Sequence, residues 1–181
     1  MTRKKRLLMI LGVVVVLVIA DQLTKYMAIL WLRQRSVIPF PAAWFPHDLF
    51  RFQYATNTGA FLSLGSSLGE SARFWLLTGL NTVILVAVAA FVTLRRDLLN
   101  SVALSLALIL SGGIGNLIDR VFRDGVVIDF MNMGIGYKNW GIRTGIFNIA
   151  DLAIVAGLVL LMASELWRGY HEKQEAATEA S

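Results

Sequence analysis

Residues 74–118 read FWLLTGLNTVILVAVAAFVTL-RRD-LLNSVALSLALILSGGIGNLI, which is two uncharged segments of 21 residues separated by a short charged linker. A bilayer core about 30 Å thick requires roughly 20 apolar residues in a spanning helix. The sequence therefore predicts transmembrane helices over residues 74–94 and 98–118. Because the linker has only three residues, the two helices are expected to form an antiparallel hairpin.

Two further segments have the same character. Residues 7–32 begin with 14 uncharged positions and stay apolar beyond Asp21 and Lys25, and residues 146–165 contain only Asp151 before the final glutamate. The chain is 56% hydrophobic and 16% charged with no cysteine, whereas soluble proteins carry about 25% charged residues. We therefore predict one integral membrane domain over residues 1–181, mainly α-helical with four transmembrane helices. A soluble enzyme and a disulfide scaffold are excluded.

The charge distribution predicts the orientation. Four basic residues, Arg3 to Arg6, stand directly before the first span, which favours a cytoplasmic N-terminus and, with four spans, a cytoplasmic C-terminus. Topology thus accounts for the net charge of +5, and we expect membrane lipids rather than nucleic acid as partners, and a monomer. A cleavable signal peptide, with residues 7–20 as its apolar core, is the alternative for the first segment.

Two long loops then lie outside the cytoplasm, over residues 33–73 and 119–145. Aromatic or apolar residues alternate with other residues at positions 50–54 and 126–130, a spacing typical of strands. We therefore predict a small extracytoplasmic β-sheet cradle over the outer ends of the helices. The C-terminal tail, residues 168–181, is polar and is expected to fray.

Several ionisable residues occur inside or at the edge of the predicted spans. A charge there costs about 2.5–3.5 kcal/mol or more and usually indicates function. Asp21 and Lys25 are one helical turn apart, which is typical of an ion pair that anchors a helix. Asp119 stands next to Arg120, and the simplest interpretation is a salt bridge at a helix end. Asp151 is harder to explain structurally, because the following residues are uncharged.

Asp129, in the second outer loop, is a further carboxylate on the same side as Asp151. Two acids in a low-dielectric site share one proton, so one can accept a proton from water while the other donates one to a scissile carbonyl. Such a pair hydrolyses peptides with no metal and no cofactor. Sequence spacing does not show that the two acids meet, and Asp129 is alternatively a turn residue or a partner for Arg123.

Small and amide side chains surround these acids in the sequence. A small residue recurs every four positions along the third span, at Ala103, Ala107, Ser111 and Gly115. Such a stripe lets membrane helices approach closely, so packing alone explains the glycines there. Neutral hydrogen-bonding groups for a site are available from Asn57, Asn116 and Asn148, of which Asn148 is alternatively only a helix N-cap.

Five motifs occur along nearly the whole chain: DQLTK at 21–25, NTGA at 57–60, GGIGNLIDR at 112–120, VIDF at 127–130 and FNIAD at 147–151. In kind, order and spacing they resemble those of the lipoprotein signal peptidases (signal peptidase II), the bacterial membrane aspartyl peptidases. The third and fifth motifs are highly specific. One departure is Phe61-Leu62, where many members have Ala-Phe or Ala-Trp.

The resemblance implies that Asp129 and Asp151 are the catalytic dyad. It implies a set of residues that line or support the site: Asn57, Gly59, Gly112, Asn116, Arg120, Asn148, Asp21 and Lys25. The implied substrate is a prolipoprotein signal peptide, cut on the N-terminal side of a diacylglyceryl cysteine at the extracytoplasmic face of the bacterial inner membrane. The resemblance also implies a short amphipathic surface helix, best placed at residues 66–73, and sensitivity to globomycin.

The main alternative from another class is a small ion- or proton-coupled transporter that uses Asp21, Lys25 and Asp151 as a relay. Transporters commonly place coupling acids near the bilayer midplane and show inverted repeats. Here the acids cluster on one side and no repeat is visible. A structural membrane protein would leave two buried acids unexplained. A protease that cuts within helices does not fit Asp129, which belongs to a loop strand.

Overall fold

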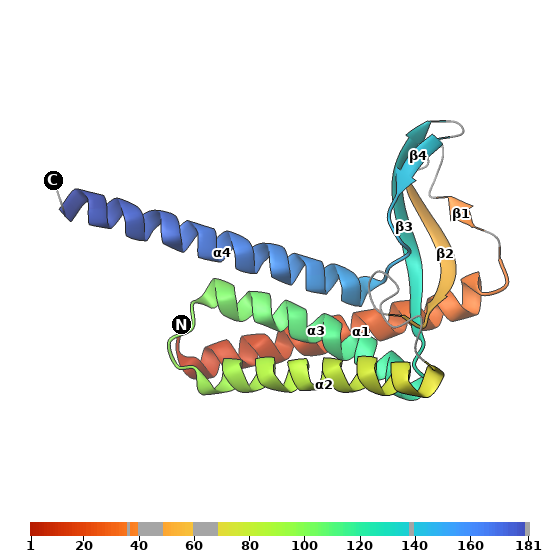
Figure 1. The fold of residues 1–181 in the computed structure, drawn as a ribbon, viewed down its shortest axis with the longest axis horizontal. Coiled ribbons are helices and arrows are strands. Elements are labelled where there is room, and N and C mark those ends of the chain that lie inside the picture. Colours follow the sequence, from red (N-terminus) through yellow and green to blue (C-terminus); the bar gives the residue numbers. More distant parts are fainter. Residues whose placement is uncertain (36, 40–48, 60–68, 138–139, 180–181) are drawn as a thin grey trace.

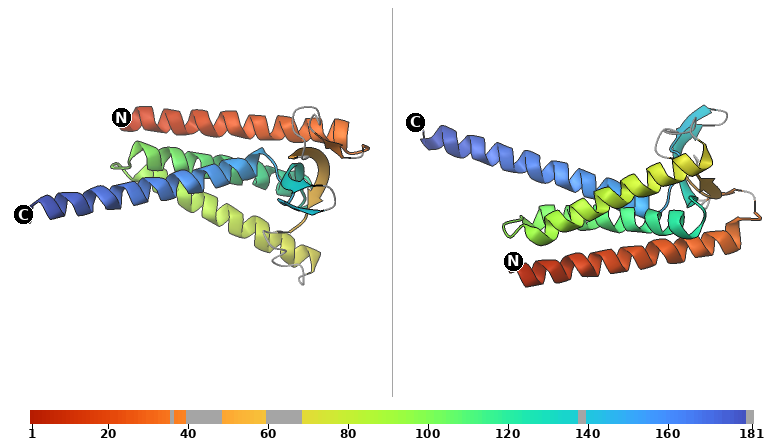
Figure 2. Two further views of the ribbon diagram at one scale, coloured as in Figure 1. Left: turned by 90° about the horizontal axis from the view of Figure 1, so that it is seen from above. Right: turned by 60° about the horizontal axis from the view of Figure 1, so that its bottom comes forward.

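The computed structural model describes residues 1–35, 37–39, 49–59, 69–137 and 140–179. Its helices are α1 (Arg3–Leu32), α2 (Glu70–Leu94), α3 (Asn100–Phe122) and α4 (Ile149–Glu179) (Figure 1). Each contains a segment long and apolar enough to cross a membrane, which confirms the four predicted spans. The start of α1 and the end of α4 lie at the same end of the bundle, as an even number of spans requires (Figures 1 and 2).

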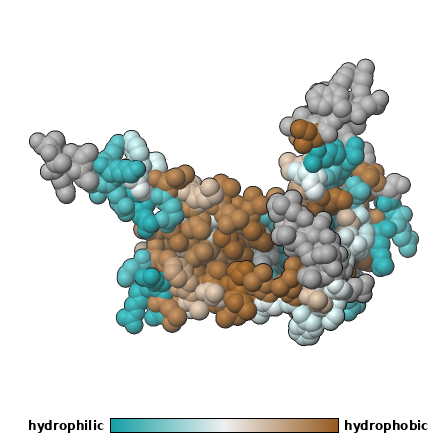
Figure 3. Space-filling model, in the orientation of Figure 1, coloured by the Kyte–Doolittle hydropathy of each residue, from teal (hydrophilic) through white to brown (hydrophobic). Residues whose placement is uncertain are grey.

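Helix α3 is the central helix. The apolar window of α3 is 61% buried, compared with 11% for α1 and 17% each for α2 and α4. The predicted small-residue stripe is buried throughout, at Ala103, Ala107, Ser111 and Gly115. The other three helices expose large apolar side chains, which form the brown belt around the middle of the molecule in Figure 3. Small side chains on α3 let its neighbours approach, and the outer helices offer their apolar surface to lipid.

The predicted sheet lies at the opposite end of the bundle from the start of α1 (Figure 1). Its strands are β1 (Ile38–Pro39), β2 (Phe50–Asn57), β3 (Val127–Tyr137) and β4 (Trp140–Arg143), paired antiparallel in that order. The aromatic residues of β2 pack with Ala28 and Leu32 of α1 and with Phe130 and Met131 of β3. This packing fixes β3, and therefore Asp129, over the C-terminal ends of α1 and α3.

A buried arginine ties the other end of the bundle together. Arg6 is 3% exposed, and its guanidinium donates hydrogen bonds to the carbonyl oxygens of Arg95 (2.8 Å), Arg96 (2.9 Å) and Leu98 (2.9 Å). Carbonyl groups at the end of a helix have no partner within that helix. The basic cluster predicted to set orientation therefore also fastens α1 to the turn between α2 and α3.

Two expectations at the helix ends need correction. The C-terminal tail was expected to fray, but α4 continues to Glu179. Ion pairs at helical spacing, from Arg168 to Glu165 and to Glu172, support this extension. Of the expected surface helix at residues 66–73, residues 66–68 lie outside the described residues. The helical residues that follow, from Glu70, form the first turn of α2, which begins four residues earlier than predicted.

The packing of α3 against α4 makes Gly112 sensitive to substitution. A methyl group added at Gly112 would lie 2.1 Å from the backbone carbonyl oxygen of Ala150. We expect Gly112→Ala to push the two helices apart and to lower the free energy of unfolding by about 1–3 kcal/mol. The matched control is Gly79→Ala, whose added methyl has nothing within 4 Å. Thermal unfolding in detergent measures both, and equal melting temperatures would contradict this prediction.

Candidate active site

The start of α4 organises the candidate site. Asn148 precedes the first helical residue, and its Oδ1 accepts a hydrogen bond from the backbone N–H of Asp151 at 2.9 Å. In return, Oδ2 of Asp151 accepts from the backbone N–H of Asn148 at 3.1 Å. This reciprocal arrangement has the geometry of a capping box, so Asn148 is an N-cap, but its contact with Asp129 shows that it is not only an N-cap. The cap also fixes the side chains of both residues at the helix end.

The amide of Asn148 also reaches the second acid. Its Nδ2 donates to Oδ1 of Asp129 at 2.6 Å and to the carbonyl oxygen of Ile128 at 3.2 Å. One asparagine therefore contacts both Asp129 and Asp151, which sequence spacing alone could not establish. Asp129 is 2% exposed, and Asp151 is half-buried.

Two more asparagines complete the contacts to the acids. Asn57, the last residue of β2, donates from Nδ2 to Oδ2 of Asp129 at 3.2 Å, and its Oδ1 accepts from the backbone N–H of Gly59 at 3.0 Å. Asn116 on α3 donates from Nδ2 to Oδ1 of Asp151 at 2.8 Å. All three predicted asparagines thus contact an acid, and each comes from a different part of the fold.

A buried ionic cluster lies beside this site. The Lys25 ammonium is 2.8 Å from Oδ2 of Asp21 and 3.0 Å from Oδ2 of Asp119, and all three side chains are 0–1% exposed. The predicted Asp21–Lys25 pair is therefore confirmed. The salt bridges of Asp119 are with Lys25 and Arg123, so the predicted salt bridge of Asp119 with Arg120 and the alternative pairing of Asp129 with Arg123 are wrong. Arg120 still interacts electrostatically with Asp119. Adjacent helical residues point about 100° apart, whereas Arg123 is one turn on from Asp119 and shares its face.

The ionic cluster also positions the strand that carries Asp129. Oδ2 of Asp119 accepts a hydrogen bond from the backbone N–H of Ile128 at 3.1 Å. The carbonyl oxygen of the same residue accepts from Asn148. Both backbone polar groups of Ile128 are therefore hydrogen-bonded, which fixes the backbone position next to Asp129.

Arg120 brings a positive charge to the two acids. Its half-buried side chain interacts electrostatically with Asp151 and Asp129, and its Nη1 is 3.5 Å from the carbonyl oxygen of Asn116. Its buried Nε has no hydrogen-bond partner among the described residues. A buried donor without a partner is costly, so this N–H is available to a bound group.

The environment of Asp129 alters its acidity. Burial, followed by the negative charge of Asp151, raises the pKa of Asp129 from 3.8 to about 6. The hydrogen bonds from Asn57 and Asn148 oppose this shift. A carboxyl group with this pKa can hold a proton or release it near neutral pH, which suits a general acid or base.

Gly112, the remaining predicted site residue, and the nearby Gly115 lie where helices pack closely. Gly112 lies against Ala150 at the start of α4, and a methyl group at Gly115 would be 2.6 Å from Oδ2 of Asp21. Sequence reasoning missed Gln22, whose Nε2 is 3.1 Å from acceptors on Asp21, Gly115 and Asp119. Gln22 belongs to the DQLTK motif at 21–25, but only the first and last residues of that motif were given a role. Among the described residues, no group of three or more acidic or histidine side chains is arranged to hold a metal ion.

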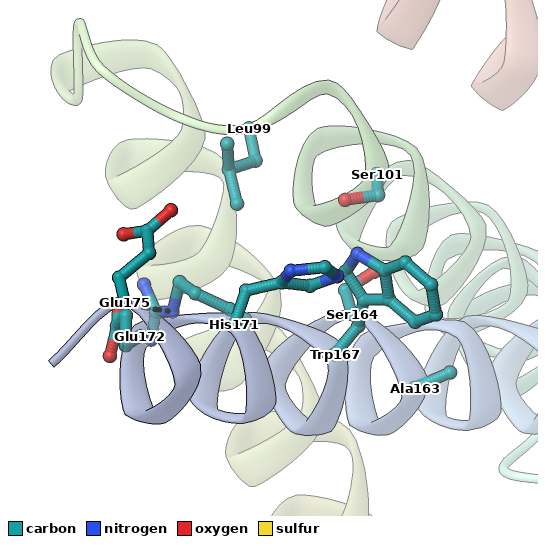
Figure 4. Close-up of a pocket in the computed structure, with 9 residues that line it drawn as sticks. Leu99, Ser101, Ala163, Ser164, Trp167, His171, Glu172 and Glu175 are labelled. Atoms are coloured by element: carbon teal, nitrogen blue, oxygen red, sulfur yellow. Dashed lines mark ion pairs between the residues drawn. The ribbon is translucent and has the colours of Figure 1, made fainter. Parts of the chain in front are cut away.

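A separate groove lies at the far end of α4 (Figure 4). It is formed by the extension of α4 around Trp167 and His171 and by the start of α3 at Leu99 and Ser101. None of the predicted site residues lines it. The groove is therefore not part of the candidate active site.

Known proteins of one family are similar to this chain over most of its length. The family model described as Signal peptidase (SPase) II matches residues 13–167. The chain belongs to the signal peptidase II family. This membership indicates a protease and favours a peptidase over the transporter and structural alternatives.

Curated relatives and a solved structure are similar to this chain over most of its length. The lipoprotein signal peptidase of Hydrogenovibrio crunogenus is 37% identical over 92% of this chain and 90% of its own length. The lipoprotein signal peptidase of Borrelia duttonii is 34% identical over 91% of this chain and 93% of its own length. A bacterial membrane enzyme structure solved by the in meso method at 2.3 Å has a TM-score of 0.67 and 28% identity, and covers 87% of each chain.

The raised pKa of Asp129 predicts a pH dependence of stability. Between about pH 4 and pH 6 the folded protein holds a proton on Asp129 that the unfolded chain has released, so the free energy of unfolding falls as pH rises. The stabilisation is complete below pH 4 and lost above pH 6, and two pKa units correspond to about 3 kcal/mol.

We therefore expect the wild-type melting temperature in detergent to fall more steeply between pH 4 and pH 7 than that of Asp129→Asn. Titrating groups that do not interact with Asp129 contribute equally to both proteins, so the difference reports this carboxyl and its interaction with Asp151. Parallel curves for the two proteins would show that the pKa of Asp129 is not raised.

Proposed function

We propose that this protein removes signal peptides from diacylglyceryl-modified prolipoproteins, cutting on the N-terminal side of the lipidated cysteine. Membership of the signal peptidase II family supports this, together with relatives that are lipoprotein signal peptidases over about nine-tenths of the chain. The substrate is anchored in the membrane, and the candidate site lies where the helical bundle meets the sheet. A substrate can therefore reach the site laterally, from within the lipid.

The catalytic groups in this proposal are Asp129 and Asp151. The observation that carries it is the contact of Asn148 with both carboxyl groups, at 2.6 Å to Asp129 and 3.1 Å to Asp151. Two acids held together in a buried site share one proton. The ionised acid takes a proton from water as the water attacks the scissile carbonyl, and the protonated acid donates its proton to that carbonyl oxygen. The first acid then gives the proton it took from water to the nitrogen of the leaving peptide, and the second acid takes a proton from a hydroxyl of the tetrahedral intermediate. The C–N bond breaks to give a carboxylic acid and an amine, and the pair again holds one proton.

Neighbouring groups have supporting roles. The unpartnered Nε–H of Arg120 can donate to a substrate carbonyl, and the positive charge offsets that of the acids. Asn57, Asn116 and Asn148 hold the two carboxyl groups in position. Gly59 fixes the amide of Asn57, and Gly112 lets α3 approach α4. Asp21 and Lys25 support this arrangement from α1.

The proposal includes location and inhibition. The protein acts in the bacterial inner membrane as a monomer, with both termini in the cytoplasm and the site on the extracytoplasmic side. Two carboxyl groups and water are sufficient for the reaction, so no metal or cofactor is required. Globomycin is expected to compete with the substrate for this site.

The first experiment is a gel-shift cleavage assay with purified protein in detergent and a diacylglyceryl-modified prolipoprotein. We expect wild-type protein to cleave. Asp129→Asn and Asp151→Asn should each lower the rate by at least about 10⁴-fold, because each removes an acid that the other cannot replace. Thermal unfolding checks that both variants fold.

Asp97→Asn is the matched control, because this acid lies in the turn between α2 and α3 at the opposite end of the bundle from the site. We expect it to retain wild-type activity. Cleavage by either folded dyad variant would remove that acid from the mechanism. No cleavage by folded wild type, where a known signal peptidase II cleaves the same substrate, would overturn the proposed function.

The orientation can be tested separately because the chain has no cysteine. Ile142, on β4, is 80% exposed, and the Glu172 side chain near the end of α4 is 69% exposed. We expect Ile142→Cys to react with a membrane-impermeant maleimide in intact spheroplasts, and Glu172→Cys to react only after permeabilisation. The reverse pattern would place the sheet in the cytoplasm.

A further inference from the structure

The ammonium group of Lys25 has its hydrogen-bonding capacity fully used. It contacts Oδ2 of Asp21 (2.8 Å), Oδ2 of Asp119 (3.0 Å) and Oδ1 of Asn116 (3.0 Å), and the side chain is 0% exposed. An ammonium group has three donors and no acceptor. Each of its three N–H bonds therefore has an assigned acceptor, and the third acceptor belongs to a residue that contacts Asp151.

This contact fixes the orientation of the Asn116 amide. Because Lys25 can only donate, the oxygen of the amide must face it, and Nδ2 of Asn148 also donates to this oxygen at 3.2 Å. The Nδ2 group of Asn116 then faces Oδ1 of Asp151 at 2.8 Å. The flipped amide would place its NH₂ group against two donors and its oxygen against a carboxylate, so it is excluded.

We propose that Lys25 is a positioning residue for the cleavage proposed above: by fixing the Asn116 amide it keeps a donor on Asp151 and thereby assigns the shared proton to Asp129. This inference rests on the proposed function. Lys25 does not touch the acids and acts through one asparagine. The consequence is that Asp151 is the ionised acid that activates water, and Asp129 is the acid that donates to the scissile carbonyl.

The donors to the two acids differ in how firmly they are held. Asp151 accepts from Asn116, which is fixed by Lys25, and from the backbone N–H of Asn148. Among the described residues, Oδ2 of Asp129 accepts only from Asn57, whose side chain is exposed at the end of β2. A protonated carboxyl must turn its O–H away from a donor. In the described part of the chain, the exposed Asn57 side chain is otherwise held by one contact, to the backbone N–H of Gly59, whereas Asn116 is buried and is held by Lys25. Displacing the donor to Asp129 therefore disrupts fewer contacts than displacing the donors to Asp151.

The charge of the Lys25 cluster does not explain the same preference. Asp21 and Asp119 carry two negative charges, and Lys25 and Arg123 carry two positive charges, so the cluster is neutral overall. The positive charge of Lys25 lowers the pKa of Asp129, so it favours the ionised form of Asp129 and opposes this assignment. Arg120 interacts with both acids. Orientation of an amide, rather than net charge, is therefore the route by which Lys25 affects Asp151.

The test is a set of cleavage assays that separates the orientation of the Asn116 amide from effects on folding. Lys25→Met with Asp21→Asn removes one charge of each sign, and the Asp119–Arg123 pair remains. We expect this variant and Asn116→Leu each to lower kcat by about tenfold with little change in KM, and to move the acidic limb of the kcat/KM profile to higher pH. Combining them should cause no further loss, because both act on one hydrogen bond.

The control is Asn81→Leu, which removes a half-buried amide that donates to the carbonyl oxygen of Gly113. It should leave the pH profile unchanged. Losses that multiply in the combined variant, or an acidic limb that does not move, would overturn the role of Lys25 while leaving the proposed function intact. Absence of cleavage by wild type would instead overturn the proposed function.

A second measurement needs neither activity nor a Lys25 variant. Protein labelled with ¹³C at aspartate carboxyl groups is titrated by NMR in detergent, and the Asp129→Asn and Asp151→Asn spectra assign the two resonances. We expect the Asp129 carboxyl to be protonated and the Asp151 carboxyl to be ionised when the pair holds one proton. The opposite assignment would overturn the proposal even if the Lys25 variants fail to fold.

Discussion

The structure depends on one constraint: charged groups inside a membrane must be paired, because an unpaired charge costs about 2.5–3.5 kcal/mol or more. Lys25 enters the bundle from α1 and meets this constraint with Asp21 from its own helix and Asp119 from α3. Asp21 in turn accepts the backbone N–H of Ala150 at 2.9 Å. That N–H belongs to the first turn of α4 and has no partner within its own helix. Charge pairing therefore brings α1, α3 and α4 together at one point.

The candidate site lies at this point for the same reason. The N-terminus of α4 presents unpaired N–H groups, which Asp21 and Asn148 satisfy, and its dipole favours a carboxylate such as Asp151 in the first turn. Asp119 holds the backbone of Ile128 and so brings the end of the sheet against the helices. One network thus satisfies the charges inside the membrane and holds two acids side by side. Burial of the ionised Asp129 lowers the free energy of unfolding, as its raised pKa indicates. The surrounding hydrogen bonds hold the site in place despite this cost.

Much of this could be predicted from the sequence. The spans follow from apolar length, the sheet from alternation at residues 50–54 and 126–130, and the Asp21–Lys25 pair from helical spacing. The errors came where local sequence does not specify a partner. Asp119 was assigned to its neighbour Arg120, whereas it faces Lys25, 94 positions earlier. The polar composition of residues 168–181 predicts fraying, yet ion pairs along α4 support the helix to Glu179.

By itself, the sequence determined a four-span membrane protein and named the groups that carry the proposed chemistry. Apolar length and motif content are local properties, and they require no knowledge of the fold. Only the tertiary structure decided that Asp129 and Asp151 meet through Asn148, and that Lys25 sets the orientation of Asn116. The Asn148–Asp129 contact joins residues 19 positions apart, and the Lys25–Asn116 contact joins residues 91 positions apart. Only the contact of Asn148 with Asp151, within the first turn of α4, is local. Such distances are closed by helix packing and strand register, which depend on the whole chain.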